Sequence, residues 1–173
     1  AGASSGAVYT GLAMTAKGVD SVLLATDFHN GVVDSFAADF SRRPAGGRFV
    51  DPDLPAGYAP FGIAAQGDVV FIAYAIPDAS ATLPRAGAGL GLVDVFDDSG
   101  RWLRRLVPAG GVLNAPWSMA VAPAGFGAFG GALLVANVGD GTIAAFDATS
   151  GQALGALTRP DGAVLAIDGL HGI

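Results

Sequence analysis

The 173-residue chain contains no cysteine, no glutamate and a single lysine, Lys17. The lack of cysteine excludes disulfide bonds, thiol catalysis and cysteine-ligated zinc sites. Glutamate and lysine usually fill the solvent-facing positions of helices, whereas Asp, Gly and Pro favour turns. All 15 acidic residues are Asp, and the chain has 27 Gly and 10 Pro. The composition therefore excludes a helical bundle or a coiled coil.

Charge is also scarce, since charged residues make up 14% of the chain and the net charge is -6. A surface with nine basic and fifteen acidic residues repels a phosphate backbone, which excludes nucleic acid as a partner.

Residues 107–139 carry no charge and would be long enough to span a bilayer as a helix. Three prolines and several glycines interrupt that stretch, so we expect strands and loops there and no transmembrane segment.

Three segments repeat one plan, in which an apolar strand ends in a small or polar residue, a turn follows, and a second strand ends in Phe. They are residues 22–36, 69–97 and 132–147. A short element with a matching small residue precedes each segment and recurs at the end of the chain. The matching small residues are Gly11, Gly62, Ser118 and Gly172. Their spacing of about 50 residues is typical of a four-stranded β-propeller blade.

The sequence therefore predicts an all-β fold in which residues 1–173 are part of a single β-propeller domain. The expected blade units are residues 9–57, 58–113 and 114–167, and residues 168–173 would begin a fourth blade. Three blades and one strand do not close a ring, and a half-ring leaves two apolar blade faces open. We therefore expect a fragment whose partner is the remaining half of the propeller, supplied by the same chain or by another copy.

The run from Leu134 to Asp147, Leu-Val-Ala-Asn-x-Gly-Asp-Gly-Thr-Ile-x-x-Phe-Asp, resembles the NHL-type propeller repeat. Residues 25–31, 51–61, 122–129 and 168–170 resemble a family of exported bacterial six-bladed propellers of unassigned function, some of which carry PEP-CTERM sorting tails. The resemblance implies NHL-like four-stranded blades in a six-bladed ring, of which this chain covers about half. It also implies an extracytoplasmic location in a bacterium, either secreted, periplasmic or on the cell surface.

Two glycine motifs match catalytic or cofactor-binding patterns in the wrong context. Residues 2–6 match G-x-S-x-G around Ser4, but no strand precedes the serine, so we expect a polar segment. Residues 125–130 match the dinucleotide pattern G-x-G-x-x-G, but a strand follows them where a helix would be needed. We expect a glycine-rich hairpin loop there, with Phe126 and Phe129 packed inward.

No cofactor is predicted, although calcium or a transition metal remains an open alternative. A metal site needs three or four converging ligands, and two histidines reach that number only with help from Asp or Asn. The weak candidates for metal ligands are Asp27, His29, Asn137 and Asp168. Asp-rich turns could also offer calcium ligands, although each is explained by turn chemistry and none has EF-hand spacing. These residues are Asp51, Asp53, Asp94, Asp97, Asp98, Asp140 and Asp147.

Candidate ligand-binding residues cluster in sequence around the element that opens each unit. They are Tyr58, Phe61, Trp117 and His171. Loops that lead into propeller blades form the face where ligands usually bind. We therefore predict a non-catalytic extracytoplasmic binding or surface scaffold for a small molecule or glycan.

One alternative is a metal-dependent propeller enzyme of the lactonase, lyase or esterase type with a site in the central channel. It would require His29, Asn114, Asn137 and His171 to converge on one point. Another alternative is a structural protein that assembles through open blade edges.

Overall fold

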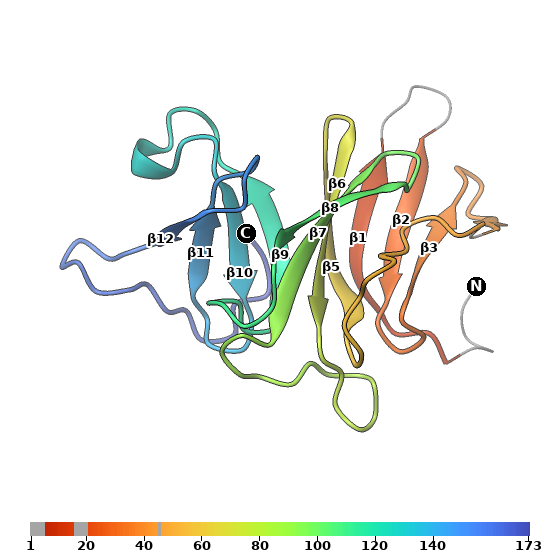
Figure 1. The fold of residues 1–173 in the computed structure, drawn as a ribbon, viewed down its shortest axis with the longest axis horizontal. Coiled ribbons are helices and arrows are strands. Elements are labelled where there is room, and N and C mark those ends of the chain that lie inside the picture. The colour runs from red at the N-terminus through yellow and green to blue at the C-terminus, as the bar shows by residue number, and fades with distance from the viewer. Residues whose placement is uncertain (1–5, 16–20, 45) are drawn as a thin grey trace.

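The computed structural model describes residues 6–15, 21–44 and 46–173, and these residues form three four-stranded antiparallel sheets (Figure 1). The first sheet contains β1 (Tyr9–Thr15), β2 (Val22–Asp27), β3 (Val32–Phe36) and β4 (Arg42–Arg43). The second contains β5 (Ala59–Gln66), β6 (Val69–Ala75), β7 (Gly91–Asp97) and β8 (Trp102–Val107). The third contains β9 (Pro116–Val121), β10 (Leu133–Asn137), β11 (Ile143–Phe146) and β12 (Ala153–Ala156). The all-β prediction is confirmed.

Tight turns join the strands where the sequence places Asp, Asn and Gly. Gly31 lies between β2 and β3 with a φ of 68°, and its amide donates to the carbonyl of Asp27 at 2.9 Å. Gly141 lies between β10 and β11 with a φ of 71°, and its amide donates to the carbonyl of Asn137 at 2.8 Å. Positive φ favours glycine, so these positions fix the hairpins and their register.

The middle sheet is buried on both faces, which explains why its strands are almost continuously apolar. Successive residues of β6 alternate between two hydrophobic clusters, with Ile72 facing the first sheet and Ala73 facing the third. The cluster between the first and second sheets contains Leu24, Val33, Phe49, Ile63, Val70, Ile72, Tyr74, Leu92 and Phe96. The cluster between the second and third contains Phe71, Ala73, Val93, Val95, Leu106, Val107, Leu113, Met119, Leu133, Val135, Ala144 and Phe146.

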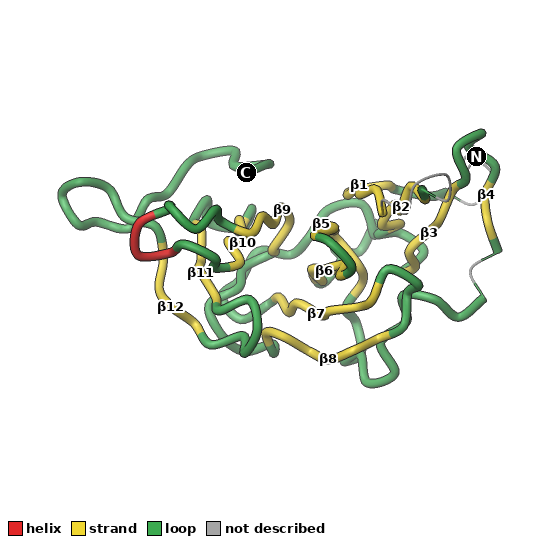
Figure 2. Tube along the Cα trace, turned by 90° about the horizontal axis from the view of Figure 1, so that it is seen from above, coloured by secondary structure: helices red, strands yellow, loops and turns green. Residues whose placement is uncertain are grey.

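The first strands of the three sheets lie close together, and each sheet runs outward from its first strand (Figure 2). The C-terminal residues reach the first strand of the third sheet, because the amide of Ile173 donates to Oγ of Ser118 at 3.0 Å. Consecutive repeats therefore meet along their first strands. In the part of the chain that the structure describes, no helix has the length and apolarity to cross a membrane.

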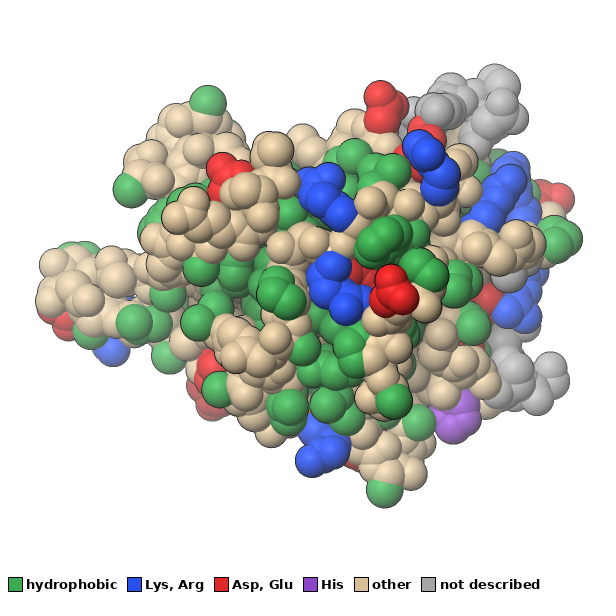
Figure 3. All heavy atoms as spheres, viewed as in Figure 1, with side chains coloured by type: hydrophobic (Ala, Val, Ile, Leu, Met, Phe, Trp, Pro, Cys, Tyr) green, Lys and Arg blue, Asp and Glu red, His purple; other side chains and the backbone are tan. Residues whose placement is uncertain are grey.

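The outer face of the first sheet exposes large apolar side chains. On β1, Leu12 and Met14 are 65% and 63% exposed, and Phe40 beyond β3 is 72% exposed. Met14, Leu23 and Phe40 line a shallow apolar groove on this face. Seen from one side, the molecule presents several patches of hydrophobic side chains with charged groups spread among them (Figure 3).

The glycine-rich loop differs from the sequence-based expectation in one respect. A strand, β10, follows the loop as expected, but the prediction that both phenylalanines pack inward is wrong, because Phe126 is 43% exposed. A short 3-10 turn, η3 (Gly127–Phe129), directs only Phe129 toward the apolar cluster of the third sheet. Ser4, the serine of the other glycine motif, lies outside the described residues.

Candidate functional site

The four residues that precede the matched small residues come together, three of them near the starts of β1, β5 and β9 and the fourth in the C-terminal segment. We call this set, Thr10, Phe61, Trp117 and His171, the strand-start row. Thr10 Oγ1 donates to the carbonyl of Phe61 at 2.6 Å, and Trp117 Nε1 donates to the carbonyl of Thr10 at 2.6 Å. The rings of Phe61 and Trp117 have centroids 5.3 Å apart, and the Trp117 and His171 centroids are 4.9 Å apart. Positions that are 51 to 56 residues apart in the sequence thus form one continuous line of contacts, which we call the contact chain.

Exposure increases along the strand-start row from Phe61 to His171. The Phe61 side chain is buried between Phe28 and Trp117, while Trp117 is half-buried and His171 is exposed. Nδ1 of His171 lies 2.6 Å from the carbonyl oxygen of Gly169. A carbonyl oxygen only accepts, so Nδ1 carries the proton and Nε2 keeps its lone pair. The exposed end of the row is therefore formed by the half-buried indole of Trp117 and the exposed imidazole of His171.

Tyr58 lies apart from the strand-start row. It packs, half-buried, against the cluster between the first and second sheets, and its hydroxyl donates to the carbonyl of Gly89 at 3.4 Å. Of the predicted ligand-binding residues, the structure therefore brings together Phe61, Trp117 and His171. Their role in binding stays a prediction.

The candidate metal ligands at the ends of the second strands hold turns in place. Oδ1 of Asp27 accepts from the amides of Val8 and Asn30, each at 3.1 Å, and Oδ2 accepts from the side chain of Asn30 at 2.7 Å. The equivalent residue in the third sheet, Asn137, accepts from the amide of Asn114 at 3.0 Å and donates to Thr142 Oγ1 at 3.1 Å. Both side chains are buried and use their oxygen atoms within the fold.

Of the other candidates, Asn114 joins Asn137. Asn114 donates to Oδ2 of Asp140 at 2.9 Å and accepts from the amide of Gly87 at 2.7 Å, so it belongs to the Asn137 turn. His29 and Asp168 lie exposed on different sheets' loops. Within residues 6–15, 21–44 and 46–173, no group of three His, Asp or Glu side chains is placed to hold a metal ion. Metal binding and the enzyme alternative stay untested predictions.

A buried charged cluster that sequence reasoning missed lies between the first two sheets. We call Asp51, Asp94 and Arg105 the Arg105 cluster. The guanidinium of Arg105 bonds to Oδ2 of Asp51, and its Nε donates to Oδ1 of Asp94 at 3.2 Å. Both carboxylate side chains have an exposed fraction of 0%, and that of Arg105 is 23%. Arginine here occupies the position between the two carboxylates that a cation would need.

The Arg105 cluster holds two carboxyl groups against one cation. Burial and the neighbouring charge of Asp51 raise the pKa of Asp94 to about 7, and the charge of Arg105 only partly offsets them. Oδ2 of Asp94 has no hydrogen-bond partner among the described residues. A proton on that oxygen would let it act as a donor, which relieves the repulsion between the two carboxyl groups.

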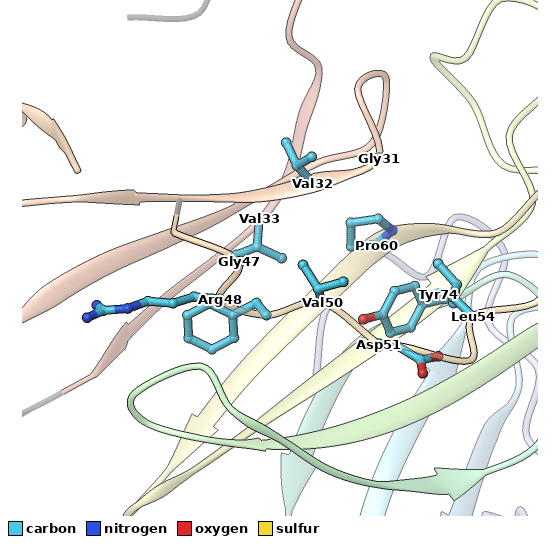
Figure 4. Close-up of a pocket in the computed structure, with 11 residues that line it drawn as sticks. Gly31, Val32, Val33, Gly47, Arg48, Val50, Asp51, Leu54, Pro60 and Tyr74 are labelled. Carbon is cyan, nitrogen blue, oxygen red and sulfur yellow. The ribbon is translucent and has the colours of Figure 1, made fainter. Parts of the chain in front are cut away.

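A cavity lies beside the Arg105 cluster, between the first and second sheets and under the connection from β4 to β5. Its walls are mostly apolar, and Figure 4 shows the side chains that line it. They are Val32, Val33, Arg48, Phe49, Val50, Asp51, Leu54, Pro60 and Tyr74, with the backbone of Gly31 and Gly47. The Tyr74 side chain is buried, and burial together with the carboxylates of Asp94 and Asp51 raises the pKa of its hydroxyl far above its usual range.

Sequence comparison finds viral relatives. Two uncharacterised proteins of Acanthamoeba polyphaga mimivirus are each 36% identical over 171 residues, which cover 96% of this chain and 41% and 44% of the viral proteins. A third uncharacterised protein of the same virus is 33% identical over 172 residues, covering 96% of this chain and 31% of the viral protein. The chain spans less than half the length of the curated relatives it matches.

Structural comparison finds distant likenesses. A protein of unknown function from Bacteroides caccae has a TM-score of 0.38 and 14% identity, covering 88% of this chain and 61% of that one. A chain of a nidogen/laminin complex has a TM-score of 0.29 and 14% identity, covering 92% of this chain and 83% of that one.

No family model matches the chain. The expected membership in an exported bacterial propeller family is therefore wrong, because the curated relatives are viral proteins. The extracytoplasmic location rested on that resemblance alone and stays a prediction. The chain resembles uncharacterised mimivirus proteins over nearly its whole length.

Proposed function

We propose that the chain forms part of a β-propeller that binds a ligand, without catalysing a reaction, at the exposed end of the strand-start row. The observation that carries this proposal is the contact chain through Thr10, Phe61, Trp117 and His171. It supports an arrangement in which successive four-stranded repeats stand around one axis with their first strands innermost. Aromatic side chains that stay partly exposed where such strands begin offer a flat, apolar contact surface.

The ligand class that best fits this surface is a neutral glycan. Sugar rings present apolar C–H faces that pack on an indole, and hydroxyl groups that donate to an imidazole nitrogen such as Nε2 of His171. The net charge of -6 disfavours polyanions. Further repeats of the same kind, from the rest of a longer chain or from a second copy, would cover the open faces of the outer sheets.

A hexasaccharide that binds at the strand-start row is expected to change the fluorescence of Trp117. The probes are cellohexaose, xylohexaose, laminarihexaose and chitohexaose, titrated into a Trp102→Phe background that leaves Trp117 as the single tryptophan. His171→Ala should raise the Kd of the binding sugar about 5-fold, since it removes one exposed contact of ~1 kcal/mol. His29→Ala is the matched control, because His29 is an exposed histidine outside the row. The proposal fails if no probe changes the emission, or if both histidine variants weaken binding equally.

The 173-residue chain by itself is expected to self-associate in solution. Leu12 and Met14 point to the same side of β1, and a contiguous exposed apolar face of this kind usually marks an interface. Sedimentation velocity should show species larger than the 17.1 kDa monomer, and Leu12→Asp with Met14→Asp should reduce them. Leu83→Asp is the control, since Leu83 is 64% exposed in the loop between β6 and β7. A monodisperse monomer of the unmodified chain would contradict the idea that these faces need a partner.

A further inference from the structure

The cavity between the first and second sheets has the size of a small-molecule site. Its volume is about 110 Å³, and an engineered apolar cavity of ~150 Å³ in another protein holds benzene. Val32 and Val50 are 40% and 59% exposed, so the cavity opens to solvent beside them, while Val33 and Phe49 form its buried wall. Because this cavity is smaller than that one but open at its mouth, a six-membered ring would fill it and reach into the mouth.

One polar group in this cavity lacks a partner. The Tyr74 side chain is only 2% exposed, and no described residue forms a hydrogen bond with its hydroxyl. Figure 4 shows the Tyr74 ring among the lining side chains, with its oxygen on the side of Val50. The hydroxyl oxygen is not sealed in the core, so it can donate to a molecule that enters the cavity.

The surroundings of Tyr74 decide which partner suits it. Burial and the carboxylates of Asp94 and Asp51 raise the pKa of the phenol, so the hydroxyl keeps its proton and acts as a donor. A ligand must then supply an acceptor. Asp51 also lines the cavity, and the guanidinium of Arg48 points away from Tyr74 (Figure 4), so the lining near the hydroxyl disfavours an anion.

We propose that this cavity binds a neutral small molecule with a compact apolar body and a single hydrogen-bond acceptor, which accepts from the Tyr74 hydroxyl. The site is separate from the strand-start row and does not depend on the function proposed for that row. The apolar body fills the space between Val33, Val50 and Leu54, and a carbonyl or ether oxygen reaches Tyr74.

Cyclohexanone, cyclohexane and cyclohexanecarboxylate test the three parts of this proposal. Chemical-shift titration of the folded protein should give a Kd for cyclohexanone of roughly 1 mM, a typical affinity for so few atoms. Cyclohexane, which lacks the acceptor, should bind about 5-fold more weakly, and the carboxylate should not bind measurably.

Tyr74→Phe should abolish the preference for cyclohexanone over cyclohexane by weakening cyclohexanone about 5-fold and leaving cyclohexane unchanged. Tyr58→Phe is the matched control, because Tyr58 does not line the cavity, and it should keep the preference. Val50→Trp fills the mouth from an exposed position and should abolish binding of both neutral probes without unfolding the protein. No binding by the unmodified protein, an unchanged preference in Tyr74→Phe, or unchanged binding in Val50→Trp would each overturn the proposal.

Discussion

Replacing Gly62 with alanine is expected to destabilise the folded chain by at least ~3 kcal/mol. A Cβ atom at Gly62 would lie 1.7 Å from the carbonyl oxygen of Trp117 and 2.6 Å from its carbonyl carbon. These are backbone atoms of β9, so they move only if β5 and β9 separate. The backbone of Gly62 is not in the left-handed region, so the expected loss comes from the steric clash alone.

Gly111→Ala is the matched control for this substitution. A Cβ atom at Gly111 would meet no atom within 4 Å, and its φ is not positive. The change should therefore be neutral or stabilise the fold by up to ~1 kcal/mol through the unfolded state. Urea unfolding of both variants compares the free energies. Equal stability of the two would mean that the first strands of the second and third repeats do not approach each other as described.

Replacing Arg105 with methionine is expected to destabilise the chain by ~3 kcal/mol at pH 8. Methionine keeps much of the side-chain volume but leaves the carboxyl groups of Asp51 and Asp94 buried without a cation. Removing one partner of a buried ion pair is far more damaging than removing an exposed pair. The control is Arg101→Met, because Arg101 is 75% exposed in its pair with Asp97 and should cost less than ~1 kcal/mol.

The loss in Arg105→Met should shrink as the pH falls to 5. The pKa of Asp94 is about 7 in the folded protein, above its ordinary value of 3.8. A raised folded pKa means that the contribution of the bound proton to stability is complete below about pH 4 and is lost as the pH rises through 7. At pH 5 Asp94 is already protonated, so only Asp51 loses a charged partner.

The double variant Arg105→Met with Asp94→Asn separates repulsion between the carboxyl groups from loss of packing. Asparagine cannot ionise and can donate to Asp51, as protonated Asp94 would. The double variant should recover part of the stability lost at pH 8 and show little recovery at pH 5. Thermal unfolding at both pH values measures this. A loss in Arg105→Met that is the same at pH 5 and pH 8 would show that the side chain acts by packing and not by its charge.

Local signals in the sequence predicted the strands and turns well. The hairpins at Gly31 and Gly141 follow from glycine after Asn or Asp between apolar runs, and such signals act over a few residues. The recurrence of a small residue about every 50 residues was also visible in the sequence, but the structural reason for it was not. Gly62 is small because β9 lies against it, and a neighbouring strand more than 50 residues away leaves no mark on the local pattern.

The motifs that resembled a bacterial family indicate architecture and not ancestry. Runs such as Leu134 to Asp147 encode a buried strand, a tight turn and a second strand, and any chain that builds this hairpin needs a similar pattern. That is why the all-β prediction held while the predicted bacterial family did not.

By itself, the sequence determined the kind of structure this chain forms. The lack of glutamate, the single lysine, the many turn residues and the period of about 50 residues leave antiparallel sheets as the outcome, because propensity and periodicity act locally. Only the tertiary structure decided where chemistry can occur. Asp94 and Arg105 are cross-strand partners in the β7–β8 hairpin, but Asp51 reaches them from the connection between β4 and β5, which also covers the cavity beside Tyr74. The path of that connection depends on tertiary packing, which residue spacing does not encode.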